Sequence, residues 1–174
     1  MKARSSRGFT LLEVVVVTVI VAILAGFITL SIGSRDTEDR MQTEAQRLQQ
    51  LIELAAEESQ LKGVQLGLQF TDQGYRFLTL DDKSNLWRPY QTGGPLRPRA
   101  LPPPFRIELR IDDRQMPSAP SQQPPQKTKP QVLIYSSGQM TPFTAVLSAP
   151  DLSFAYRLKA DALGGLKLEA ETGS

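Results

Sequence analysis

Adjacent acidic side chains are the first candidates for chemistry in this chain of 174 residues. Such pairs occur at Glu57–Glu58, Asp81–Asp82 and Asp112–Asp113. Two adjacent carboxylates on a helix point apart, so we interpret Glu57–Glu58 as part of a solvated face rather than as an acid–base pair. Neither aspartate pair has the spacing, glycine and closing glutamate of a calcium-binding loop. We therefore interpret both aspartate pairs as turn residues.

The sequence contains no histidine and no cysteine. The commonest general base is therefore missing, and so are thiolate nucleophiles, thiolate metal ligands and disulfides. There is also no glycine-rich phosphate loop. The sequence predicts no catalytic site, no cofactor and no metal site, and it argues against an enzyme.

Glu13 is an acid in an unusual place, because it lies within the apolar run from Phe9 to Ile32. At about 1.5 Å per residue this run can cross a bilayer core of roughly 30 Å as a helix. Lys2, Arg4 and Arg7 precede it, which predicts a cytoplasmic N-terminus. Everything after about Ser34 would then face the periplasm.

A secretory signal peptide cut after Ala22 or Ala25 is the simplest alternative for this segment. Glu13 argues against it, since a carboxylate costs up to about 2.5–3.5 kcal/mol in mid-membrane. The surrounding apolar side chains contribute about 0.3–0.6 kcal/mol each, so insertion is still favourable. A disposable signal has no use for this charge, whereas an intramembrane acid is a functional candidate by default.

Residues 7–13, Arg-Gly-Phe-Thr-Leu-Leu-Glu, resemble the processing signal of type IV pilins and pseudopilins. The resemblance implies that a prepilin peptidase cuts after Gly8 and that the new N-terminal residue, Phe9, is N-methylated. It also implies that Glu13, then the fifth residue, meets the terminal amine of a neighbouring subunit and sets the register of a filament. A nearby positive charge relieves the cost of an isolated carboxylate in an apolar medium.

The chain after Ser34 changes to an amphipathic helical pattern. Apolar residues recur at steps of four and three, at Met41, Ala45, Leu48, Ile52 and Ala55. We expect one long helix with a transmembrane half at residues 9–32 and an amphipathic half at residues 33–63, preceded by a leader at residues 1–8. Gly63 is its expected end.

Residues 64–174 change to a period of two, which is typical of strands. The expected strands are 64–70, 75–80, 86–90, 105–111, 132–135, 143–147, 152–158 and 166–170. The predicted fold is α+β: a long N-terminal helix packed on an antiparallel β-sandwich-like head. Two segments rich in proline and polar residues, 91–104 and 112–131, are expected to be loops, the second of them mobile.

The region around Trp87 and the segment Val132–Leu147, with Gly138, Gln139 and Thr141, resemble the head of general secretion pathway protein H. This resemblance implies a minor pseudopilin of a type II secretion system, at the tip of the pseudopilus or between tip and shaft. Its partners would be other minor and major pseudopilins, the prepilin peptidase and the inner-membrane assembly platform. The chain would be a single-pass protein of the bacterial inner membrane with a periplasmic head.

Two other functions share part of this pattern. One is a minor pilin of a type IV pilus or DNA-uptake machine, and the other is a membrane-anchored periplasmic enzyme. Without Lys2, Arg4, Arg7 and Glu13, the remaining chain has equal numbers of basic and acidic residues. No nucleic-acid partner is therefore expected, although a local cluster such as Arg97 and Arg99 stays possible.

Overall fold

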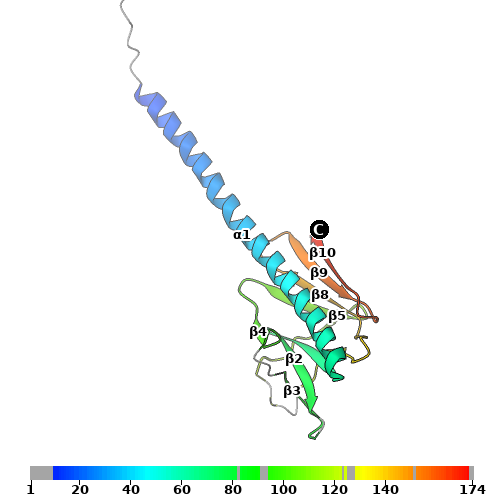
Figure 1. The fold of residues 1–174 in the computed structure, drawn as a ribbon. Coiled ribbons are helices and arrows are strands. Elements are labelled where there is room, and N and C mark those ends of the chain that lie inside the picture. The colour runs from blue at the N-terminus through cyan, green and yellow to red at the C-terminus, as the bar shows by residue number, and fades with distance from the viewer. Residues whose placement is uncertain are drawn as a thin grey trace, which may run out of the picture. The chain divides into compact units, whose positions relative to one another are not determined.

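The computed structural model describes residues 10–81, 83–90, 94–122, 124, 128–150 and 152–172, and only the backbone of residues 25–35. Its first element is the helix α1, Leu11–Lys62, which is uninterrupted across both predicted halves (Figure 1). Gly63 ends it with a positive φ of 64°. The N–H of Val64 donates to the Ser59 carbonyl oxygen at 3.1 Å. This is the Schellman pattern, which favours glycine at that point because a Cβ would strain the left-handed backbone.

Ten short strands follow α1 among the described residues, and all of their ladders are antiparallel. The first sheet has the order β3-β2-β1-β7, and β4 also pairs with β2. Its strands are β1 (Leu66–Thr71), β2 (Gly74–Asp81), β3 (Leu86–Pro89), β4 (Arg99–Ala100) and β7 (Val132–Ile134). The second sheet has the order β10-β9-β8-β5-β6. Its strands are β5 (Arg106–Ile111), β6 (Arg114–Met116), β8 (Phe143–Ser148), β9 (Phe154–Ala160) and β10 (Leu166–Thr172).

The chain forms two compact units, Met1–Asp39 and Arg40–Ser174, and the second of these is the head. The predicted stripe of α1 lies in the core of the head, and its five members from Met41 to Ala55 are all buried. Ile52 and Ala55 pack in one cluster with Phe70 and Phe77 of the first sheet and Leu158 of the second. The amphipathic helix thus joins two sheets that share one apolar core, and the predicted α+β class is confirmed.

The two segments expected to be loops each contain a strand, so that part of the prediction is wrong. Residues 91–104 include β4, which pairs with β2, and the fully buried Leu96. Residues 112–131 include β6, which pairs with β5. Both strands are two or three residues long and are held by backbone hydrogen bonds, so hydrophobic periodicity cannot reveal them.

Candidate functional site

The first turn of α1 places Glu13 beside Thr10. The backbone N–H of Glu13 donates to Thr10 Oγ1 at 3.3 Å and to the Thr10 carbonyl oxygen at 3.1 Å. Thr10 is therefore the N-cap of α1, and Glu13 is the third residue of the helix. A carboxylate there interacts favourably with the helix dipole. Gly8 and Phe9, the predicted processing residues, lie outside the described residues.

The sequence reasoning missed the role of Thr10, although a signal was present. Threonine followed three residues later by glutamate, just before an apolar run, is the sequence pattern of a helix N-terminus. The same four residues therefore both begin the helix and carry the acid.

The apolar side chains on both sides of Glu13, from Leu11 to Leu24, are exposed in the described chain. Leu11 is 83% exposed, and the large apolar residues from Val14 to Leu24 are each about half exposed. Thr18, a polar residue among them, donates its hydroxyl to the Val14 carbonyl oxygen at 2.6 Å. Within the described residues, no helix is found that has the length and hydropathy of a membrane span.

The aspartates interpreted as turn residues do shape turns. Asp81 Oδ1 accepts hydrogen bonds from the backbone N–H groups of Lys83 (3.0 Å) and Ser84 (3.1 Å). The hydrogen bond from Ser84 is the main reason that the pKa of Asp81 lies below its ordinary value. Asp112 and Asp113 both have positive φ, 50° and 60°, in the tight turn between β5 and β6. Asp82 lies outside the described residues.

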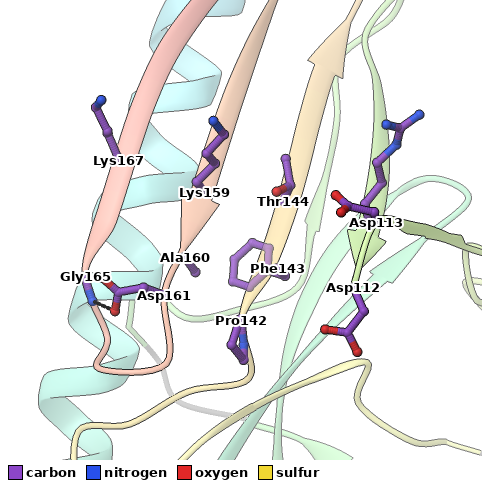
Figure 2. Close-up of a pocket in the computed structure, with 11 residues that line it drawn as sticks. Asp112, Asp113, Pro142, Phe143, Thr144, Lys159, Ala160, Asp161, Gly165 and Lys167 are labelled. Atoms are coloured by element: carbon purple, nitrogen blue, oxygen red, sulfur yellow. Dashed lines mark hydrogen bonds between the residues drawn. The ribbon is translucent and has the colours of Figure 1, made fainter.

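A hollow of about 410 Å³ lies on the second sheet near that turn. Figure 2 shows Lys159 and Lys167 on neighbouring strands, with Asp112 and Asp113 on the turn across from them. The two lysines form ion pairs with Glu169. The two lysines therefore have structural partners, and the hollow offers no arrangement for proton transfer among its described residues. Nor is any group of three or more potential metal ligands found in the described part of the chain.

The residues behind the second resemblance lie in a structural turn. Gly138 has a φ of 87°, and the backbone N–H of Leu133 donates to Thr141 Oγ1 at 3.1 Å. Thr141 returns a bond from its own N–H to the Leu133 carbonyl oxygen at 2.9 Å. Trp87 lies half-buried in β3, where it pairs with Leu80. All of these residues shape the head, and none of them forms a reactive site.

A small cavity of about 220 Å³ was not foreseen from the sequence. Tyr75 and Arg76 of β2 and Arg99 of β4 line it together. The pairing of Tyr75 with Arg99 brings these residues together, and this pairing depends on the unpredicted strand β4.

Comparison with known families matches the two parts of the chain separately. The family model described as "Prokaryotic N-terminal methylation motif" matches residues 3–29. The model described as "Type II transport protein GspH" matches residues 44–164, which is most of the head. The first match includes the Thr10–Glu13 turn, and the second includes the apolar stripe of α1 from Ala45 onward and most of both sheets.

Individual relatives match most of the chain. The type II secretion system protein H of Pseudomonas aeruginosa is 33% identical over 144 residues, covering 80% of this chain and 81% of the relative. The protein of the same name from Escherichia coli is 31% identical over 146 residues, covering 82% and 80%. A crystal structure of the minor pseudopilin EpsH from the type II secretion system of Vibrio cholerae aligns with a TM-score of 0.64, at 23% identity, over 76% of this chain and 97% of that one. The fold, the family models and the relatives together identify this chain as a member of the GspH family of type II transport proteins.

Proposed function

We propose that the chain is a minor pseudopilin, a structural subunit of the type II secretion pseudopilus, located at its tip or between tip and shaft. The observation that carries this proposal is the joint match of one chain to the methylation motif and to the GspH family. Its work is mechanical: the subunit enters a filament that drives protein export across the outer membrane. Membership in a family of structural subunits supports a non-catalytic role.

The helix start supports a specific part for Glu13 in assembly. Cleavage after Gly8 leaves a positive α-amine on Phe9. The hydrogen bond to Thr10 holds Glu13 in the first turn of α1, only four residues after that amine. The apolar side chains from Leu11 to Leu24 are exposed and need lipid or neighbouring helices to cover them. Glu13 then selects neighbours that bring an amine to the same depth, because a buried carboxylate without a counter-charge is costly.

The proposed partners and location follow from this role. The partners are other minor and major pseudopilins, the prepilin peptidase and the inner-membrane assembly platform. Before assembly the subunit is held in the inner membrane with a cytoplasmic N-terminus and a periplasmic head, in accordance with Lys2, Arg4 and Arg7 ahead of the apolar run. A minor pilin of a type IV pilus shares the N-terminal signal, but the match over residues 44–164 favours secretion.

Mass spectrometry of the N-terminus tests this proposal. The full chain, expressed together with the prepilin peptidase of the same bacterium, should begin at an N-methylated Phe9. A Gly8→Val variant should keep Met1 and stay unmethylated, whereas Lys2→Gln, a change in the leader away from the cut, should be processed normally. A parent chain that retains Met1–Gly8, or that loses the whole apolar segment, would contradict the assignment.

A further inference from the structure

The outer face of the first sheet carries a small apolar layer of its own. Leu78 is fully buried, yet it belongs to neither core cluster of the head. It pairs with Gly67 on β1 and Pro89 on β3, and it faces away from the core because the preceding residue, Phe77, faces into it. A Cβ atom at Gly67 would stand 3.1 Å from Cζ3 of Trp87, which lies on β3. The ring of Trp87 therefore extends across β2, which lies between β3 and β1, and covers Leu78.

The chain between β6 and β7 completes this cover. We refer to residues 117–122 and 128–131 as the first and second limbs of a strap. Pro130 on the second limb lies over β1, where its Cβ would stand only 2.5 Å from a Cβ atom at Gly67, so there is no room for a side chain at that position. Thr128 on the same limb is buried. No residue of either limb belongs to a core cluster, so the strap forms a layer separate from the core.

The first limb is held on the free end of β1. β7 pairs with β1 only at Leu66–Leu68, which leaves the backbone groups farther along β1 open on that edge. There the N–H of Ala119 donates to the Phe70 carbonyl oxygen, and the Ala119 carbonyl oxygen accepts from the N–H of Asp72, both at 3.0 Å. Asp72 Oδ1 also accepts from the N–H of Ser121 at 2.8 Å. This limb is therefore attached by hydrogen bonds, and its own side chains are exposed or only half-buried.

Two side chains on the outer face of the sheet tie the limbs together. Gln69, which is only 2% exposed, donates from Nε2 to the Lys129 carbonyl oxygen at 2.7 Å. Arg76, its partner in the ladder, donates from Nη1 to the Ser121 carbonyl oxygen at 3.2 Å. The two side chains also bond each other, because Arg76 Nε donates to Gln69 Oε1 at 2.7 Å. A continuous series of hydrogen bonds thus links Lys129 on the second limb to Ser121 on the first.

Closing the strap has a cost, which falls on Arg76. Its guanidinium donates only to neutral acceptors, and it forms no ion pair with a carboxylate in the described part of the chain. Its Nη2 is buried and has no hydrogen-bond partner among those residues. Burial lowers the pKa of Arg76, because it disfavours the charged form. Hydration of this cation therefore favours the open strap, whereas burial of Leu78 and Trp87 favours the closed one.

We propose that the strap opens as one unit while the rest of the head stays folded, and that opening uncovers Leu78 and Trp87. Segments held by few apolar contacts open at a lower free energy than the core of the same protein. The hydrogen bonds through Gln69 and Arg76 couple the two limbs, so neither limb is released without loosening the other. The strap thus covers an apolar surface in the free subunit and exposes it without unfolding. This property belongs to the single chain and does not rest on the proposed function.

Thiol labelling tests whether Leu78 is uncovered without unfolding. The chain has no cysteine, so Leu78→Cys in the full chain in detergent micelles gives a single thiol beneath the strap. Leu158→Cys, buried in the core on the second sheet, is the matched control. With excess iodoacetamide in native buffer, Leu78→Cys should be labelled at least about tenfold faster than Leu158→Cys. Equal rates would show that the strap opens only when the whole head unfolds, and would overturn the proposal.

A second experiment asks whether the two limbs open together, and it uses no cysteine. Gln69→Ala removes a hydrogen bond to the second limb directly, and it acts on the first limb only through Arg76. Amide exchange, measured by NMR on the ¹⁵N-labelled full chain, should accelerate about tenfold both at Ala119 on the first limb and at Gln131 on the second. Thr144→Ala, on the outer face of the second sheet, is the control and should change neither rate. Acceleration at Gln131 alone would show that the limbs move separately, which contradicts opening as one unit.

Discussion

A Cβ atom at Gly164 would stand 2.5 Å from the backbone carbonyl oxygen of Gly138. The turn between β9 and β10 therefore lies directly on the turn between β7 and β8, with no room for a side chain. Gly138 also faces Gln60, which lies near the end of α1. A Cβ atom at Gly138 would stand 3.2 Å from Gln60 Nε2. Two glycines thus allow three separate elements to meet at one end of the head.

Gly164→Ala should destabilise the head by about 2 kcal/mol or more, because φ is 90° and the new methyl group meets backbone that cannot move aside. The matched control is Gly63→Ala, which has a φ of 64° but open space around it. Its cost should be only about 1–2 kcal/mol of backbone strain. Chemical denaturation of the full chain in micelles, followed by the fluorescence of the single tryptophan, Trp87, measures both. Equal losses would show that the contact with Gly138 is unimportant.

Ile52→Ala should lower the free energy of unfolding by about 2–5 kcal/mol, because the side chain is fully buried where α1 meets both sheets. Leu61→Ala, on the same helix but 86% exposed, should change it by less than about 0.5 kcal/mol. The same denaturation assay applies. A small effect at Ile52 would mean that α1 does not anchor the two sheets.

The pH dependence of stability should change when Tyr90 is replaced by phenylalanine. The Tyr90 hydroxyl donates to Glu58 Oε2 at 2.5 Å and is the main cause of the lowered pKa of Glu58, followed by Lys62. A lowered pKa in the folded state adds stability above the ordinary glutamate pKa of 4.5, and this is lost as the pH falls through the folded value. Unfolding midpoints of parent and variant should therefore differ at pH 7 and converge toward pH 3.

The control for this measurement is Tyr135→Phe, which removes the hydroxyl of a tyrosine that is 40% exposed. Its unfolding midpoints should follow those of the parent chain at each pH. A constant difference between Tyr90→Phe and the parent from pH 7 to pH 3 would refute the coupling between Tyr90 and Glu58.

Thr10→Val should loosen the first turn of α1, because it removes the hydroxyl that caps the N–H of Glu13. Loss of an N-cap costs about 1 kcal/mol, which corresponds to roughly fivefold faster amide exchange at Glu13. Hydrogen exchange by NMR on the full chain in micelles measures this. Thr18→Val is the matched control, since the Thr18 hydroxyl bonds only the Val14 carbonyl oxygen within the helix. Comparable acceleration in both variants would argue against the cap.

Glu13→Leu should leave cleavage and methylation largely intact but reduce incorporation into the filament by an order of magnitude or more, since removing one partner of a buried ion pair leaves the other charge uncompensated at a cost of several kcal/mol. N-terminal mass spectrometry and quantitative cross-linking to neighbouring subunits measure the two effects. Glu57→Leu, an exposed acid on the distal half of α1, is the control. Normal incorporation of Glu13→Leu would refute the proposed role of this acid.

The sequence by itself determined the parts of this protein that depend on local pattern. The apolar run around Glu13 is a matter of local composition, and the stripe from Met41 to Ala55 and the alternation in most strands are each one periodicity along the chain, so α1 and the α+β class could be predicted. The resemblance to pilins and pseudopilins rested on seven consecutive residues, and that to protein H rested on short segments of the head; the two family models confirm both.

Only the tertiary structure decided the features that depend on residues far apart in sequence. The strands β4 and β6 form because their backbone groups pair with those of β2 and β5. Their side chains show no alternation of apolar and polar residues that would predict a strand. The cavity of Tyr75 and Arg99 arises from that pairing, and the contact of Gly164 with Gly138 arises from two turns meeting in space. Backbone pairing and close approach are set by the whole fold, because almost any residue can supply an N–H and a carbonyl group.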